Sequence, residues 1–147
     1  MKKRLLQIMK NSSTSHDLGY TIIRISLGIV FLIFGYSKLT SGATHLVGIG
    51  SAMGLFGITN GYIFWGYMAA LTEFCAGLAF IFGILTRLAC LPLIWLLIVA
   101  MTFHINKGDA FTVWGFACTC LCITIGILIT GSGKYSVDYA IIKHLDQ

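Results

Sequence analysis

One ionisable residue, Glu73, lies inside the long apolar run from Tyr62 to Leu85. A run of this length predicts a transmembrane helix. At about 1.5 Å per residue, Glu73 lies roughly 17 Å from either end, near the middle of a bilayer. An uncompensated carboxylate at that depth costs about 2.5 to 3.5 kcal/mol on insertion scales, so we expect it to be protonated, paired with a cation or exposed to a wet cavity. The first question that the sequence raises is therefore which groups Glu73 faces inside the bundle.

Arg24 is the second charge at membrane depth, about 9 Å into the apolar run from Leu18 to Leu39. Each of the two charges belongs to a helical stripe rich in small residues: Arg24, Gly28, Phe31, Gly35 and Lys38 in one, and Tyr62, Gly66, Ala69, Glu73, Gly77, Phe80, Ile84 and Arg87 in the other. Small residues let membrane helices pack closely, so both stripes are predicted to face the bundle interior. We expect Arg24 and Glu73 to be coupled there, because their depths differ by about 9 Å, within the combined reach of the two side chains or of a bridging water.

Three further polar residues are candidates near the same interior. His104 closes the run that begins at Leu88, and Tyr36 and Lys38 lie at the end of the first run. Lys38 is expected to extend toward the lipid headgroups, as lysines near helix ends do. If Arg24 does not reach Glu73, then His104 and Tyr36 are the next candidates to hydrogen-bond the carboxyl group.

Four apolar runs predict the helices that position these residues. The chain has 147 residues, 57% hydrophobic and only 10% charged, which is typical of membrane proteins. A helix satisfies its own backbone hydrogen bonds in lipid, so we predict an all-α polytopic membrane protein, a four-helix transmembrane bundle. Its helices are expected at about 18–39, 62–85, 88–104 and 110–129. The glycine-rich segment 40–61 is expected to hold a short interfacial or re-entrant helix, which could also cap a pocket.

The distribution of lysine and arginine predicts the orientation. One side of the bundle receives Lys2, Lys3, Arg4, Lys10, Arg87, Lys134 and Lys143, and the other only Lys38 and Lys107. The positive-inside rule then places both termini in the cytoplasm, as a basic tail of residues 1–17 and a C-terminal tail of residues 140–147 around a membrane domain of residues 18–139. Because the net charge of +5 arises mostly at helix ends, no nucleic-acid partner is expected.

All the cysteines, Cys75, Cys90, Cys118, Cys120 and Cys122, lie in apolar runs, and no CxxC pair occurs in the sequence. Cys118 and Cys122 are one helical turn apart whereas Cys120 points the opposite way, so the group is not a metal triad, and no metal site is expected. We interpret these residues as small hydrophobic side chains. The sequence also contains no P-loop, dinucleotide fingerprint, metalloprotease helix or nucleophile elbow.

The order and spacing of these features resemble the DoxX family of small four-helix bacterial membrane proteins, from about Leu18 to Tyr139. The matching pieces are Arg24, Gly35 to Leu39 (GYSKL), Glu73 to Gly77 (EFCAG), Gly83 to Arg87 (GILTR), His104, and Gly131 to Asp138 (GSGKYSVD). The resemblance implies a multi-pass protein of the bacterial inner membrane.

The family resemblance implies two classes of function. In the first, the chain is a subunit of a redox-linked membrane complex that interacts with a quinone. Glu73 and His104, about 5 to 6 Å apart in depth, would pass protons to the quinone or hydrogen-bond it. The residues that would contribute to binding and tune its charge are Arg24, Lys38 and Tyr36. The alternative is a non-enzymatic chaperone, scaffold, or small-molecule or lipid-binding protein, whose buried charges only hold the bundle together.

The same resemblance bears on partners. The chain lacks the extra domain expected of a full thiosulfate oxidoreductase, so independent catalysis is not expected. We expect instead a protein partner or a homo-oligomer within the lipid bilayer.

Overall fold

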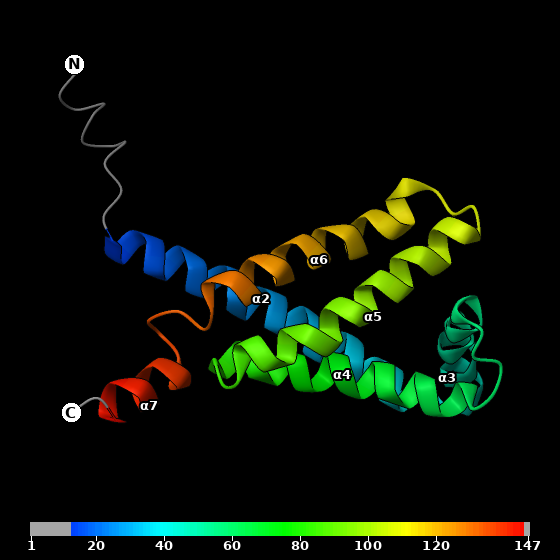
Figure 1. The fold of residues 1–147 in the computed structure, drawn as a ribbon, viewed down its shortest axis with the longest axis horizontal. Helices are drawn as coiled ribbons and strands as arrows, with labels where there is room; N and C mark the ends of the chain where they lie inside the picture. The colour runs from blue at the N-terminus through cyan, green and yellow to red at the C-terminus, as the bar shows by residue number, and fades with distance from the viewer. Residues whose placement is uncertain (1–12, 146–147) are drawn as a thin grey trace, which may run out of the picture.

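The computed structural model describes residues 13–145, which form an elongated bundle of helices (Figure 1). The elements are α2 (Ser13–Thr40), α3 (Ala43–Gly50), the 3-10 helix η1 (Ser51–Phe56), α4 (Tyr62–Phe82), α5 (Thr86–Asn106), α6 (Phe111–Thr130) and α7 (Val137–Leu145). Four of them, α2, α4, α5 and α6, are long and apolar enough to cross a membrane. The described residues contain no strand. The predicted all-α four-helix class, with a shorter helix between the first two, is confirmed.

The helices differ from the predicted apolar runs mainly at their ends. α2 begins at Ser13 rather than Leu18, because polar residues continue the helix beyond the apolar run. α4 ends at Phe82 rather than Leu85, because Gly83 adopts a left-handed conformation with φ of 69° and caps the helix. Leu85, with φ of 49°, then directs the chain into α5. The basic residues at positions 2, 3, 4 and 10 lie outside the described part of the chain.

Glycines bring α2 and α4 into close contact. A Cβ atom on Gly28 would lie 2.9 Å from the carbonyl oxygen of Gly77, and a Cβ on Gly77 would lie 2.5 Å from the backbone nitrogen of Leu32. Two turns further along α2, Gly35 packs against the backbone of Phe74 in α4. Larger side chains would push the helices apart, so the two predicted stripes of small residues do form the helix-packing surface.

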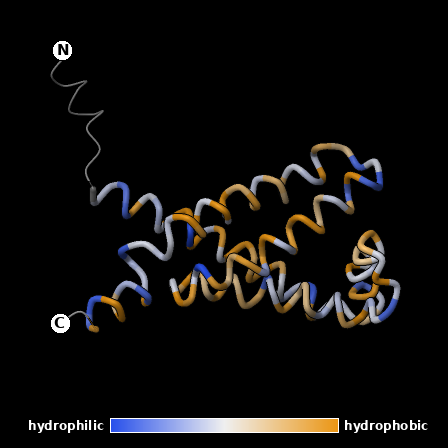
Figure 2. Tube along the Cα trace, viewed as in Figure 1, coloured by the Kyte–Doolittle hydropathy of each residue, from blue (hydrophilic) through white to orange (hydrophobic). Residues whose placement is uncertain are grey.

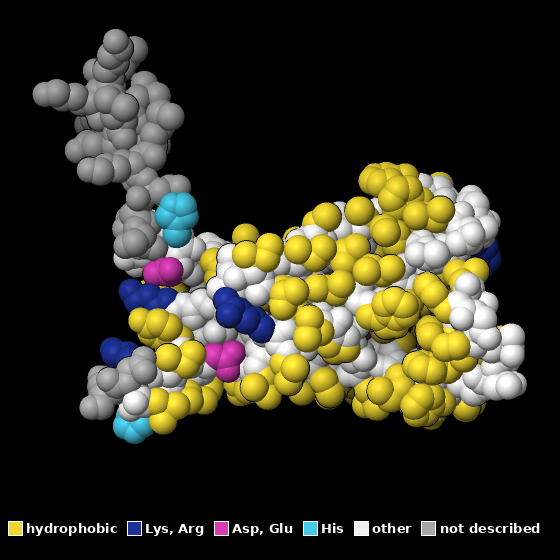
Figure 3. All heavy atoms as spheres, in the orientation of Figure 1, with side chains coloured by type: hydrophobic (Ala, Val, Ile, Leu, Met, Phe, Trp, Pro, Cys, Tyr) yellow, Lys and Arg dark blue, Asp and Glu magenta, His cyan; other side chains and the backbone are white. Residues whose placement is uncertain are grey.

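The outside of the bundle is apolar over the four long helices. In Figure 2 hydrophobic residues extend along all of them, and polar colours concentrate at the two ends. Figure 3 shows the same division in space: yellow side chains cover the middle of this face, while the visible lysines and arginines lie mostly at the end that holds the chain termini. The buried core between the helices includes Phe31, Phe80, Leu93 and Ile127. An apolar exterior around an apolar core is what a lipid environment requires.

The segment between α2 and α4 folds back over the N-terminal half of α4. Leu46 of α3 is fully buried, and its carbonyl group lies against Gly66 of α4. Gly50, at the end of α3, lies equally close to the carbonyl of Tyr62. In Figure 1 this segment crosses the bundle at the end opposite the termini. The predicted short helix is therefore packed against protein, and it contributes to the wall of the cavity described below.

Polar side chains connect the segments at the other end of the bundle, where the termini lie, by hydrogen bonds. The carboxylate of Asp138 accepts hydrogen bonds from the backbone nitrogens of Leu85 (2.9 Å) and Thr86 (3.3 Å), so α7 supplies the cap for the start of α5. Arg87 donates to the carbonyl of Ile129 at 3.1 Å, near the C-terminus of α6. A guanidinium group is favourable at that end of a helix dipole.

Candidate functional site

Lys38 and Glu73 form an ion pair inside the bundle, with 2.5 Å between Lys38 Nζ and Glu73 Oε1. The Glu73 side chain is 5% exposed and that of Lys38 is 27% exposed. Lys38 lies in the last turn of α2, one turn after Gly35, and the close packing at Gly35 brings its ammonium group to the middle of α4. The prediction that Lys38 extends toward the headgroups was therefore wrong, because a buried carboxylate stabilises its charge more than partial hydration does.

Arg24 does not pair with Glu73, which corrects the predicted coupling of these two residues. Its guanidinium group donates to the carbonyl oxygens of Phe80 at 2.6 Å and Tyr135 at 2.8 Å, and the residue is only 1% exposed. The register of α2 and α4 explains the difference. Gly28 lies opposite Gly77, so Arg24, one turn before Gly28, lies level with the end of α4 rather than with its middle.

A cavity of about 390 Å³ opens beside the ion pair. Its walls come from α2, α3, η1, α4, α5 and α6, and most of its lining is apolar. Aromatic rings contribute on several sides, including Phe31, Phe34, Trp65 and Trp95. The volume and the apolar character are typical of a small-molecule site.

Few polar groups reach this cavity, and Glu73 is the most unusual of them. Lys38, Thr72, Glu73 and His104 line it. Oxygen Oε2 of Glu73 is buried and has no hydrogen-bond partner among the described residues. A buried carboxylate oxygen without a donor costs several kcal/mol, more than a neutral group would. The cavity wall therefore contains an unsatisfied carboxylate next to the Lys38 ammonium group.

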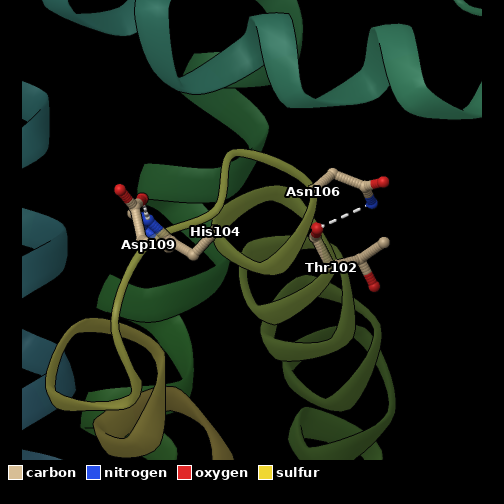
Figure 4. A network of polar contacts seen from close by, with 4 residues as sticks. All are labelled: Thr102, His104, Asn106 and Asp109. Carbon is tan, nitrogen blue, oxygen red and sulfur yellow. Dashed lines mark hydrogen bonds and ion pairs between the residues drawn. The ribbon is translucent and has the colours of Figure 1, made fainter.

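His104 contributes to the cavity wall from the last turns of α5. Its Nδ1 atom lies 2.7 Å from Oδ2 of Asp109, across the turn between α5 and α6 (Figure 4). The two side chains are 35% and 30% exposed. In the same turn, Asn106 donates to the carbonyl of Thr102 at 2.9 Å and points away from this pair (Figure 4). With Nδ1 engaged by Asp109, Nε2 is the ring atom that remains for exchange with water or a bound molecule.

The structure thus brings together three of the five predicted site residues, since Lys38, Glu73 and His104 line one cavity. Arg24 and Tyr36 are not among the residues that line it. Tyr36 is 61% exposed, because it lies two positions before Lys38 and therefore on the opposite side of α2. Glu73 is paired with Lys38 rather than with Tyr36, and the role of Tyr36 as a binding residue stays a prediction.

Sequence reasoning missed two residues that matter here. Asp109 orients the imidazole of His104, and its position five residues further on, across a short polar turn, was an available signal. Thr72 lines the cavity next to Glu73 in the sequence, but a threonine in an apolar helix gives no signal of its own. Among residues 13–145, no group of three histidines, cysteines or acidic residues is arranged to hold a metal ion.

Comparisons with known proteins agree with this architecture. The family model called DoxX matches residues 19–105, from α2 to the end of α5. The chain is also similar to a protein of Escherichia coli K12 called inner membrane protein YqjF, with 34% identity over 131 residues, which are 86% of this chain and 95% of that protein. No solved structure gives a significant match to the chain.

Proposed function

The chain belongs to the DoxX family, and we propose that it is an inner-membrane subunit of a redox-linked complex that binds a quinone in the cavity beside Glu73. One observation supports this most directly: Glu73 lines an apolar cavity, has one buried oxygen without a hydrogen-bond partner among the described residues, and binds the Lys38 ammonium group through its other oxygen. The inner-membrane location rests on the similarity to the Escherichia coli protein and on the four apolar helices.

The polar groups of the cavity match the chemistry of a quinone headgroup. A quinone is a flat ring with carbonyl oxygens that accept hydrogen bonds, and it takes up two electrons and two protons on reduction to the quinol. Lys38 carries three N–H donors, of which Glu73 Oε1 occupies one, so the others can bind a carbonyl oxygen. Glu73 Oε2 can accept a hydrogen bond from a quinol hydroxyl group. The rings of Phe31, Phe34 and Trp95 provide apolar surface on which the flat ring can pack.

His104 and Asp109 extend this site toward the aqueous phase. Both side chains are partly exposed at the α5–α6 turn, and His104 also lines the cavity. Asp109 holds the ring by Nδ1 and leaves Nε2 to exchange protons, which is the arrangement of an oriented general acid or base. We assign to His104 the exchange of protons between water and the cavity. The electrons come from a partner protein, so the chain acts as a subunit in the lipid bilayer.

The same proposal includes an orientation with both termini in the cytoplasm. Within the described residues, Arg87, Lys134 and Lys143 lie at or beyond the helix ends near the termini, whereas Lys107 follows α5 at the opposite end of the bundle. This distribution supports a cytoplasmic position of the end that holds the termini. The α5–α6 turn with His104 and Asp109 then faces the outer side.

A fluorescence titration tests the quinone site. Trp65 and Trp95 line the cavity, so a small quinone without a tail should quench the fluorescence of the purified protein in detergent and reach saturation. Glu73→Gln and Lys38→Met should each weaken the binding by about tenfold or more, because each removes a charged hydrogen-bonding group. Tyr36→Phe is the matched control near Lys38 and should leave the affinity unchanged, because Tyr36 faces away from the cavity.

Failure of this binding test would favour the alternative function, a non-enzymatic chaperone or scaffold. If the quinone does not saturate, or if the Glu73 and Lys38 variants bind it as tightly as the wild type, then the quinone assignment is wrong. Copurification of a protein partner without any quinone in the solvent extract would then support a non-enzymatic chaperone or scaffold.

A further inference from the structure

A second depression, an open apolar groove of about 570 Å³, follows the outer side of α4 and α5. Met68, Thr72 and Pro92 line both this groove and the cavity beside Glu73. The two spaces are therefore neighbours that meet at these three residues.

We propose that the groove holds the long apolar tail of the molecule whose headgroup lies in the cavity. The ligand class is then a membrane-resident quinone with an isoprenoid chain, bound from the side through the lipid between α4 and α5. This inference rests on the proposed quinone site and specifies its ligand, because a water-soluble quinone would have no use for the groove.

The two spaces differ in polarity as the two parts of such a molecule do. The cavity contains the charged groups of Lys38 and Glu73 and the ring of His104. Among the described residues, the groove is lined by aliphatic side chains, small side chains, one threonine and the thiol of Cys75. Leu71 and Leu88 stand 43% and 62% exposed at its sides, and Ala79 and Ala89 leave space between them. A headgroup with a hydrocarbon chain matches this polar-to-apolar order.

Pro92 lies at the junction of the two spaces. Proline has no backbone N–H, so the carbonyl of Leu88, one turn earlier in α5, loses its normal helical partner. Leu88 lines the groove and Pro92 lines both spaces, so one helical hydrogen bond of α5 is missing where the molecule would pass. Such positions in membrane helices adapt to neighbouring groups more easily than a regular helix does.

The native cysteines provide a matched test. Cys75 and Cys122 are both exposed, but Cys75 lines the groove, whereas Cys122 on α6 lines neither space. Affinities are measured by tryptophan quenching in the same detergent for two probes, a quinone with a long isoprenoid tail and its tailless counterpart. Cys75→Phe should weaken binding of the tailed quinone by about tenfold and leave the tailless one unchanged, because the new ring fills the groove and not the cavity. Cys122→Phe should change neither affinity.

A second pair of variants avoids dependence on the fit of the introduced ring. Leu88→Ala removes one side of the groove, and Leu91→Ala, at a 55% exposed position on the same helix outside both spaces, is its control. Leu88→Ala should weaken only the tailed quinone, by about threefold to fivefold. Taking the ratio of the two affinities within each variant removes differences in how the probes partition into the micelle.

The outcomes separate this inference from the function on which it rests. If the tailless quinone binds and depends on Glu73, but neither groove variant changes the ratio of affinities, then the tail assignment is wrong and the headgroup site stands. If a long-tailed isoprenoid alcohol binds with dependence on Cys75 while the tailless quinone does not bind, then the groove stands and the quinone headgroup is wrong. If neither tailed nor tailless probes bind, both assignments are wrong.

Discussion

Among residues 13–145 two charged side chains, Arg24 and Glu73, are buried, and their surroundings differ in kind. Arg24 donates hydrogen bonds to the backbone carbonyls of Phe80 and Tyr135, which have fixed positions in the fold. Glu73 is held by one flexible lysine side chain and keeps one oxygen free beside a cavity. Arg24 Nε also has no partner within the described residues, but Arg24 lines neither cavity nor groove. Arg24 therefore stabilises the contact between helices, whereas Glu73 is the buried charge that lines the cavity.

The position of each charge along the bundle supports this division. Arg24 lies where α2, the end of α4 and the segment after α6 meet, close to the caps that Asp138 and Arg87 provide. These contacts satisfy backbone groups at helix ends and in the connection between α6 and α7, which lipid would leave without a partner. Lys38 and Glu73 lie toward the opposite half, where α3 and η1 close one side of the cavity.

The largest effect is expected from Arg24→Met. This change removes the donors from the carbonyls of Phe80 and Tyr135 at the meeting point of three segments, so thermal unfolding in detergent should show a loss of about 3 to 5 kcal/mol, typical of two hydrogen bonds from a charged group. Arg87→Met, which removes only an exposed hydrogen bond to Ile129, is the control and should cost much less. Folded Arg24→Met protein should still bind the quinone, and a selective loss of binding without loss of stability would reverse the comparison.

A double-mutant cycle on Lys38 and Glu73 is expected to give the next largest effect. Lys38→Met leaves the buried Glu73 carboxylate without its counter-charge and Glu73→Gln leaves the partly buried Lys38 without its own, whereas the double variant leaves no unpaired charge. The stability losses should therefore be non-additive, with a coupling of about 1 to 3 kcal/mol. The same cycle on Arg24 and Glu73 should be additive within about 0.5 kcal/mol, since the two residues share no partner. Coupling between Arg24 and Glu73 would contradict the observed pairing.

A smaller effect is expected from Asp138→Ala, at the end of the bundle where the termini lie. The variant loses both hydrogen bonds to the start of α5, so its stability should fall by about 1 kcal/mol, as for other helix caps. Asp138→Asn keeps one acceptor oxygen and should recover part of that loss. Quinone affinity should be unchanged in both variants, and a change in affinity as large as that of Glu73→Gln would show that the two ends of the bundle are not independent.

The sequence was sufficient for the helices and for the burial of both charges. The four apolar runs correspond to the four long helices, and the stripes of small residues identify the faces of α2 and α4 that meet at Gly28, Gly35 and Gly77. The reason is physical: lipid requires each helix to satisfy its own backbone, and close packing requires small side chains, so both leave a periodic signal.

The pairing of the charges was not predictable in the same way. Depth counted from the helix ends places Arg24 within reach of Glu73, but the register between α2 and α4 is set by the contact of Gly28 with Gly77, which shifts Arg24 toward Phe80. Residues two positions apart point to opposite sides of a helix, so the helical periodicity alone places Tyr36 and Lys38 on opposite faces of α2. The cavity itself depends on how six segments enclose a space, for which a single sequence carries no local signal.

A structure of the purified protein with added quinone would show whether the cavity beside Glu73 binds the quinone ring. The account predicts a flat ring in the cavity, with an oxygen atom within hydrogen-bonding distance of Lys38 Nζ or Glu73 Oε2, and with its substituent directed past Thr72 and Pro92. The Glu73→Gln variant, studied in the same way, should lose the ring or leave it weakly occupied. A cavity that holds only a lipid or detergent chain, with Glu73 paired as before and the quinone bound elsewhere, would contradict the account.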